Sequence, residues 1–331
     1  MQEQPAPVLF IVGPTGVGKT RLAVALAQRF RCEIVNADSR QVYRHMDIGT
    51  AKPTAEERRQ APHHLLDLLD PDQGFGLGSF LPLAASAITG ILERGRLPMV
   101  VGGTGQYIWA LLEGWDVPQV PPDPEFRRSK QAELEQDGPL ALHQELQRVD
   151  SQRAAELDPR NTRRVIRALE VHNSTGRPHS DFGVRSGAMR ATFVLGLTMD
   201  RRDLYRRIDH RVDQMLADGL EDEVRRLQAM GLPMGKGPLA SPGYVEMGQY
   251  LAGDITLDQA VQRAKFRTHR LARRQYAWFK LTDQRITWLD AAALDVYSQA
   301  VAQVTNFLNR KIPCDTIGEN LPRSKGTEPG T

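Results

Sequence analysis

Cysteine is scarce in this chain of 331 residues, which contains only Cys32 and Cys314. Two cysteines are too few for a structural zinc site or a disulfide framework. Cys32 adjoins an apolar segment and Cys314 lies in a polar tail, so we expect no bridge between them, as in a reducing cytoplasm. No apolar run approaches the roughly 20 residues of a membrane helix, and the amino terminus lacks the basic segment of a signal peptide. We therefore predict a cytoplasmic protein with no membrane contact.

Acidic residues are absent from residues 259–282, which contain seven lysines and arginines. A second basic cluster spans residues 160–167. Although the formal net charge is only +3, this segregation favours a polyanionic partner. A solvated helix face is the alternative interpretation of the same charges.

Strands and helices alternate along the first third of the chain. Short runs at 8–12, 34–35 and 97–103 predict strands, and the segments 17–30, 80–95 and 104–113 predict helices. Apolar strands that alternate with helices are typical of an α/β fold with a parallel sheet covered by helices. We expect a further strand at 191–199, long helices at 201–231 and 257–280, and a last strand and helix within 286–310.

Four prolines between Pro118 and Pro124 mark a linker. The polar segment that follows shows helical patterns and no convincing strand, so we predict that residues 118–190 form an inserted all-helical domain. Residues 1–117 and 191–311 then form the two parts of the core. The tail at 312–331 is rich in glycine, proline and polar residues, which predicts disorder. Nothing in the sequence implies a protein partner, and we expect a monomer.

The segment GPTGVGKT fits the phosphate-binding pattern G-x-x-x-x-G-K-[ST] at every position, and it stands between an expected strand and an expected helix. In such a P-loop, backbone N–H groups point at phosphate oxygens, the lysine adds a positive charge, and the hydroxyl can ligate Mg²⁺. The sequence therefore predicts a phosphate site, with Mg²⁺ bound through Thr20, formed by Gly13, Pro14, Thr15, Gly16, Val17, Gly18, Lys19 and Thr20.

Asp38 follows the second expected strand. Since the carboxyl ends of parallel strands meet at one edge of a sheet, Asp38 and the P-loop are expected to share a cleft. An Asx turn or a helix N-cap is the structural alternative for this aspartate. An NTPase would also carry an apolar strand ending in an aspartate, whereas the strand predicted at 97–103 ends in Gly102 and Gly103. The motif thus predicts that a phosphate group binds here, but it does not identify the molecule that carries the phosphate.

Three segments together resemble the tRNA dimethylallyltransferases: GPTGVGKT, NADSRQVYRHMDIGTAKP and VVGGTGQYIWALLEG. TRRVIRALEV, RIDHRVDQML and RRQYAWFK extend the resemblance to about Lys311. The resemblance implies that the enzyme transfers a dimethylallyl group from its diphosphate to N6 of the adenosine next to the anticodon on its 3′ side, and releases diphosphate. In this family the P-loop holds the diphosphate of the prenyl donor.

The implied chemistry needs few groups, and each has a candidate. The amine proton becomes acidic as the new C–N bond forms, so a carboxylate is a suitable general base, and Asp38 takes that role. Negative charge on the leaving diphosphate calls for cations. The resemblance adds Arg211 to Lys19 and Thr20, and it places Thr104 in the channel where donor and base meet. Sequence alone leaves Arg211 equally compatible with a solvated helix surface, and Thr104 with an N-cap.

An enzyme that reaches N6 in an anticodon loop must bind RNA and splay out the base. The segment RTHRLARRQYAWF offers Arg270, Arg273 and Arg274 for backbone contacts, and any exposed aromatic could stack a base. Trp278 and Phe279 are more typical of the core side of the helix. By resemblance, further tRNA contacts are expected from Asp38, Ser39, Arg40, Gln41, Thr104, Arg127, Arg163, Arg164 and Arg167.

The chain departs from the family pattern at Gln106, which places a polar amide near the expected channel, and at Pro242 and Val245 around Tyr244. Three other functions remain open on the residues alone. A P-loop kinase would explain the phosphate-binding motif but not the basic helix. An enzyme that prenylates free adenine nucleotides would not need a basic surface large enough for RNA. A non-enzymatic RNA-binding protein would explain the basic segments but would give Asp38 no role.

Overall fold

The computed structural model describes residues 6–183 and 191–311, so the predicted disordered tail lies outside the described residues. Six parallel strands form one sheet in the order β3-β2-β4-β1-β5-β6. Their bounds are β1 Pro7–Val12, β2 Cys32–Asn36, β3 His63–His64, β4 Leu97–Val101, β5 Ala191–Thr198 and β6 Ile286–Asp290. The predicted α/β fold is confirmed, with β3 and the short helix α2 (Ala55–Gln60) as elements that the sequence patterns did not reveal.

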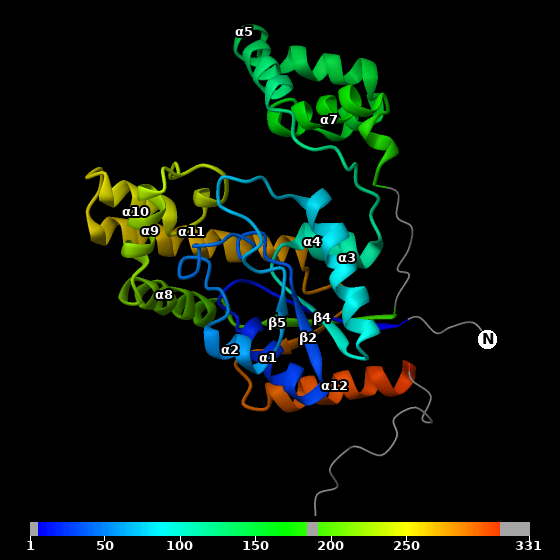
Figure 1. Ribbon diagram of the computed structural model, residues 1–331, viewed down its shortest axis with the longest axis vertical. Helices are drawn as coiled ribbons and strands as arrows, with labels where there is room; N and C mark the ends of the chain where they lie inside the picture. The colour runs from blue at the N-terminus through cyan, green and yellow to red at the C-terminus, as the bar shows by residue number, and fades with distance from the viewer. Residues whose placement is uncertain (1–5, 184–190, 312–331) are drawn as a thin grey trace, which may run out of the picture.

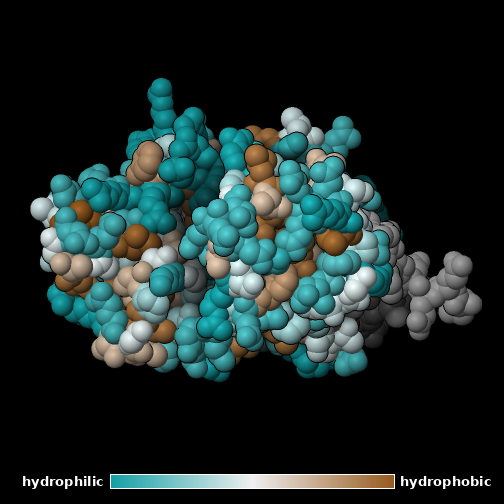
Figure 2. All heavy atoms as spheres, turned by 90° about the horizontal axis from the view of Figure 1, so that it is seen from above, coloured by the Kyte–Doolittle hydropathy of each residue, from teal (hydrophilic) through white to brown (hydrophobic). Residues whose placement is uncertain are grey.

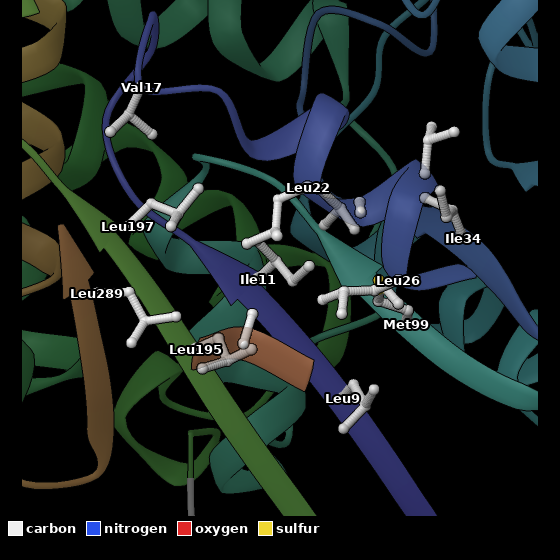
Figure 3. Packing of buried hydrophobic residues seen from close by; sticks show 14 of the residues in the cluster. Leu9, Ile11, Val17, Leu22, Leu26, Ile34, Met99, Leu195, Leu197 and Leu289 are labelled. Carbon is white, nitrogen blue, oxygen red and sulfur yellow. The ribbon is translucent and has the colours of Figure 1, made fainter. Parts of the chain in front are cut away.

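Alternate residues of β1 point to opposite faces of the sheet, and each face has its own core. Leu9 and Ile11 pack with α1 (Lys19–Phe30) and α12 (Val296–Lys311) on one face (Figure 3). Val8 and Phe10 pack on the other face with α3 (Leu77–Glu93) and α4 (Gly105–Glu113). Figure 1 shows the two helical layers on either side of the strands. Strands buried on both faces explain their continuous apolar sequences.

Among the described residues between α4 and β5, three α-helices form a separate lobe, drawn at the top of Figure 1: α5 (Pro124–Val149), α6 (Ser151–Glu156) and α7 (Thr162–Thr175). The lobe has its own hydrophobic cluster, which includes Leu146, Val165 and Leu169. Seen from above, its surface is mostly hydrophilic (Figure 2). The segment predicted to be helical therefore packs on itself and contains no strand among its described residues.

The predicted helix at 201–231 is wrong as a single element. It divides into α8 (Arg201–Ala217) and α9 (Leu220–Ala229) at Gly219, whose φ of 100° lies in the left-handed region. Three acidic residues in the first turn of α9 are a helix-start signal that could have revealed the break. After α10 (Tyr244–Leu251), α11 (Leu257–Trp278) runs from α10 toward α4 (Figure 1).

Candidate active site

The carboxyl ends of β1, β2 and β4 meet at one edge of the sheet, so the loops that follow them lie together. The backbone N–H of Ala37, after β2, donates to the carbonyl of Val101 at the end of β4. A Cβ on Gly102 would lie 2.2 Å from the Ala37 carbonyl oxygen, so only glycine permits this approach. The P-loop after β1 is equally close to β5, since a Cβ on Gly13 would lie 2.5 Å from the Leu197 carbonyl oxygen.

A cavity of about 640 Å³ opens at this edge. Its lining includes Lys19, Thr20, Asp38, Gln41, Arg211 and Gln275. Residues from the P-loop, the loop after β2 and helices α8 and α11 therefore face one space. A cavity of this size with a few converging charged groups is the usual form of a small-molecule site.

Lys19 begins α1, and its ammonium group donates to the carbonyl oxygens of Gly13 and Pro14 at 3.0 and 2.9 Å. Burial lowers the pKa of Lys19 to about 8, and the negative charge of Asp38 opposes that shift. Arg211 adds a further lowering effect on the same pKa. The three charged groups thus lie close enough to influence one another, as a site for an anionic group requires.

Asp38 is held by its own backbone and side chain. Its N–H donates to Oδ1 of the buried Asn36 at 3.1 Å, and its Oδ1 accepts the N–H of Arg40 at 2.9 Å. The second bond is an Asx turn, so the structural role considered for Asp38 exists alongside its place in the cavity lining. Asn36 is a positioning residue that the sequence patterns did not single out.

Thr104 contacts the loop that carries Asp38 but is not among the residues that line the cavity. Its Oγ1 accepts the backbone N–H of Ser39 at 3.0 Å, which ties the loop after β4 to the loop after β2. Thr104 precedes α4 but makes no side-chain cap for that helix. Thr104 is thus the N-cap residue of α4 by position, as the alternative interpretation held, but its hydroxyl is used for the contact with Ser39 and not for capping.

Arg211 lies on α8 and lines the cavity together with Arg207 and His210. Burial lowers the pKa of the Arg211 guanidinium, and the charge of Asp38 opposes this effect. An arginine that merely covered the outer surface of an amphipathic helix would not be desolvated in this way. The structure thus places Arg211 in the cavity lining, whereas the sequence alone left open whether it lies at the site or on a solvated helix surface.

The loop at 47–54 forms one wall of the cavity and is fixed by a buried glutamate that sequence analysis missed. Glu223 on α9 is 2 % exposed, and its carboxylate accepts the backbone N–H groups of Asp47, Ile48 and Gly49 at 2.8 to 3.0 Å. Gln41 holds the same loop by donating to the carbonyls of Thr50 and Ala51. Glu223 reads as an ordinary helix residue, and only its contacts reveal this role.

Tyr244, in the segment where the chain departs from the family pattern, is internal. Its hydroxyl donates to Glu223 at 2.7 Å, and a Cβ on Gly49 would lie 2.6 Å from its ring. Glu246 accepts from Arg267 on α11 at 2.6 Å.

Gln106 has an exposed side chain, whereas the adjacent Tyr107 is buried and stacks on Phe80.

The predicted RNA contacts in the helical lobe fall into two kinds. Arg163 and Arg164 on α7 are exposed. Arg127 and Arg167 instead bind the carboxylate of Glu170, which is 0 % exposed, with Arg127 donating to both oxygens at 2.7 and 2.8 Å. These two arginines hold the lobe together, although 43 % of the Arg127 side chain and 31 % of the Arg167 side chain remain accessible.

The basic helix α11 presents Arg270, Arg273 and Arg274 to solvent. Phe279 is fully buried, as predicted, but the prediction for Trp278 is wrong, because its side chain is 43 % exposed. The Trp278 ring lies against the start of α4, where a Cβ on Gly105 would come within 2.2 Å of it. Phe266 is a more exposed aromatic on the same helix, at 58 %, and lies beside Arg270.

Two negative findings concern the described parts of the chain. Across residues 6–183 and 191–311, the helices are too short or too polar to cross a membrane. The same residues contain no cluster of three or more histidine, cysteine, aspartate or glutamate side chains arranged to hold a metal ion.

Comparison with known families and proteins gives matches along most of the chain. Residues 41–282 match the family described as IPP transferase, and residues 6–68 match the family described as isopentenyl transferase. A tRNA dimethylallyltransferase of Thermomicrobium roseum is 47 % identical over 305 residues, which cover 92 % of each chain. One of Roseiflexus sp. is 47 % identical over 303 residues, covering 92 % of this chain and 99 % of that protein.

Solved structures give the same result. The tRNA isopentenylpyrophosphate transferase of Bacillus halodurans is 40 % identical, with a TM-score of 0.67, and the match covers 93 % of this chain and 98 % of that one. A eukaryotic dimethylallyltransferase that acts on tRNA is 29 % identical, with a TM-score of 0.79 over 93 % of this chain and 80 % of that one. The chain described here therefore belongs to the IPP transferase family, the family of the tRNA dimethylallyltransferases.

Proposed function

We propose that this protein transfers a dimethylallyl group from dimethylallyl diphosphate to N6 of the adenosine 3′-adjacent to the anticodon of tRNA. The observation that carries the proposal is the shared cavity, in which a P-loop lysine and a carboxylate face one space. The P-loop supports binding of a diphosphate, and the carboxylate supports removal of a proton from the attacking amine. Family membership favours this reaction over phosphate transfer by a kinase.

In the proposed reaction, the amine nitrogen attacks C1 of the dimethylallyl group while the C1–O bond to diphosphate breaks. Asp38 accepts the proton from N6, and the electron pair of the broken bond leaves with diphosphate. Lys19 and Arg211, both in the cavity lining, stabilise the charge on the departing oxygens. Thr104 keeps the loop that carries Asp38 in place through its hydrogen bond to Ser39.

Mg²⁺ fits the proposed diphosphate site. Thr20 follows Lys19 on the first turn of α1 and lines the cavity, and Mg²⁺ commonly uses one or two protein ligands together with substrate phosphates and water. Thr20 would be the protein ligand, and the ion would supply positive charge at the diphosphate. The protein's own part is to align the donor through the P-loop and to keep Asp38 near the amine.

The tRNA is proposed to contact the exposed arginines of the helical lobe and of α11, namely Arg163, Arg164, Arg270, Arg273 and Arg274. Ser39, Arg40 and Gln41 follow the base and are proposed to lie near the target nucleotide. We retain the division into a core of residues 1–117 and 191–311 and an RNA-contacting insertion of residues 118–190, and we expect a monomeric, cytoplasmic enzyme.

The decisive experiment follows ¹⁴C-labelled dimethylallyl diphosphate into unmodified tRNA in the presence of Mg²⁺. We expect label in tRNA, and an anticodon stem-loop whose target adenosine is replaced by guanosine should stay unlabelled. Label in free adenine nucleotides but not in tRNA would contradict the tRNA substrate. Phosphate transfer from ATP to a small molecule, with no carbon transfer, would contradict prenylation altogether.

A further inference from the structure

Gln275 is a buried glutamine on α11 whose amide group bridges two loops of the site. It is 8 % exposed. Its Oε1 accepts the backbone N–H of Thr15 in the P-loop at 2.7 Å, and its Nε2 donates to the carbonyl of Gly103 after β4 at 3.0 Å. These groups are separated by 260 and 172 residues in sequence. Because the oxygen and the NH₂ group of this buried amide both have hydrogen-bond partners, the side chain fixes the relative position of the two loops.

The contact with Gly103 continues to the proposed base. Thr104 is the next residue, and its Oγ1 accepts the N–H of Ser39, which directly follows Asp38. One hydrogen-bonded path therefore runs from the P-loop, through the Gln275 amide and Thr104, to the loop that carries the carboxylate. The path contains the side chains of Gln275 and Thr104, and neither residue belongs to the P-loop or to the loop that carries Asp38.

The loop after β4 passes close to the Gln275 side chain. A Cβ on Gly103 would lie 2.2 Å from Nε2 of Gln275, so only glycine fits beside the amide. The helix that carries Gln275 is itself fixed to α8 through Lys265 and Asp213, and its Tyr276 hydroxyl lies 3.0 Å from Thr198 Oγ1 at the end of β5. The amide of Gln275 thus belongs to a helix, α11, that contacts both α8 and the end of β5.

We propose that Gln275 is a positioning residue for prenyl transfer, whose amide sets the distance between the diphosphate on the P-loop and the carboxylate of Asp38. In-line displacement requires the attacking amine, the transferred carbon and the leaving oxygen to be aligned, and misplacement by about 1 Å can cost on the order of a hundredfold in rate. The inference rests on the proposed function, since it concerns the alignment of donor and base.

The first test compares Gln275→Met with wild type, because methionine has a similar size but cannot donate to Gly103 and is only a weak acceptor for the Thr15 N–H. Gln262, an exposed glutamine on the same helix, gives the matched control Gln262→Met. We expect kcat of Gln275→Met to fall by about tenfold to a hundredfold, while the Kd for tRNA stays within about twofold of wild type. The control should keep the wild-type kcat.

A second variant, Gln275→Glu, gives a readout that a purely structural role would not produce. A protonated carboxyl group can donate to Gly103 and accept from Thr15, as the amide does, whereas an ionised carboxylate cannot donate. The ratio of mutant to wild-type kcat should therefore rise as the pH falls from 8 to 6, and the ratio for Gln275→Met should stay flat. Taking the ratio to wild type removes the pH effects that all variants share.

Wild type is assayed first, so that two kinds of failure stay separate. No transfer by wild type would contradict the proposed function itself. Transfer by wild type with an unchanged kcat for Gln275→Met would overturn only the role of Gln275, as would a pH-independent ratio for Gln275→Glu. If Gln275→Met unfolds below the assay temperature in a thermal melt, the pH dependence of Gln275→Glu decides alone.

Discussion

The carboxylate of Asp38 accepts the backbone N–H of Arg40 at 2.9 Å, so this side chain shapes its own loop as well as lining the cavity. The two roles can be separated by Asp38→Asn. Asparagine can still accept the Arg40 N–H through its amide oxygen, but it cannot take a proton from an amine.

If Asp38 is the base, Asp38→Asn should lose activity about as severely as Asp38→Ala, by roughly 10²- to 10⁴-fold in kcat. Single-turnover transfer of labelled donor to tRNA measures this loss, and fluorescence titration confirms that both variants still bind tRNA. An Asp38→Asn enzyme with nearly wild-type kcat, beside an inactive Asp38→Ala enzyme, would show that only the turn matters.

The lowered pKa of Lys19, about 8, predicts a pH dependence of diphosphate binding. Below that pKa the ammonium group is charged and attracts the anion, and above it the charge is lost. The Kd for inorganic diphosphate should therefore rise between pH 7 and pH 9. Lys19→Arg stays charged over this range, so its Kd reports only the ligand's own titration, and calorimetry of both proteins isolates the contribution of Lys19. Parallel profiles for the two proteins would contradict the assignment.

The same residue affects folding in a defined direction. Because the pKa of Lys19 falls from 10.5 to about 8 on burial, the charged form is disfavoured in the folded state. Its cost to stability is fully present below pH 8 and disappears as the pH rises toward 10.5. Urea denaturation of Lys19→Met should therefore show a gain over wild type at pH 7 that shrinks at pH 9.5, and an equal gain at both pH values would contradict it.

Glu223 should contribute strongly to stability, because it is buried and accepts four hydrogen bonds. In Glu223→Gln an amide NH₂ would face backbone N–H groups, which should lower the free energy of unfolding by about 3 kcal/mol. Tyr244→Phe removes one of the four bonds and should cost about 1 kcal/mol. Urea denaturation measures both changes, with the exposed Asp222→Asn on the same helix as the control. Equal effects for Glu223→Gln and Asp222→Asn would contradict the role of Glu223.

Removing arginines from the helical lobe should have two different effects. Arg164→Ala should weaken tRNA binding and reduce the slope of log K against log salt by about 0.7 to 0.9, with stability unchanged. Arg127→Ala should instead destabilise the protein by about 2 kcal/mol. That figure lies below the cost of breaking a fully buried pair because 43 % of the Arg127 side chain is exposed.

Filter binding of tRNA at several salt concentrations and thermal melting of both variants distinguish these effects. Arg127→Lys is a useful companion, since lysine keeps the charge but cannot make the bidentate contact with Glu170. Loss of RNA affinity by Arg127→Ala at unchanged stability would show that its main partner is RNA.

Local patterns were sufficient for much of this protein. The apolar runs predicted β1, β2, β4 and β5, and the P-loop pattern depends on eight consecutive residues. Asp38 could be predicted to face the P-loop because parallel strands bring their carboxyl ends to one edge. Each of these inferences uses a periodicity or a spacing that short-range geometry enforces. The break at Gly219 has the same kind of local signal, in the acidic residues of the first turn of α9.

Local sequence patterns were enough to predict the longer strands of the sheet, the phosphate-binding loop and a carboxylate near it. That Gln275 and Glu223 hold the walls of the site follows only from the folded chain, since the backbone groups that Gln275 binds lie 172 and 260 residues away and those that Glu223 binds lie 174 to 176 residues away. A glutamine or glutamate on an amphipathic helix has the same local pattern whether it faces water or a buried backbone amide. Which of the two it meets depends on how the helices pack, and no short-range rule specifies that packing.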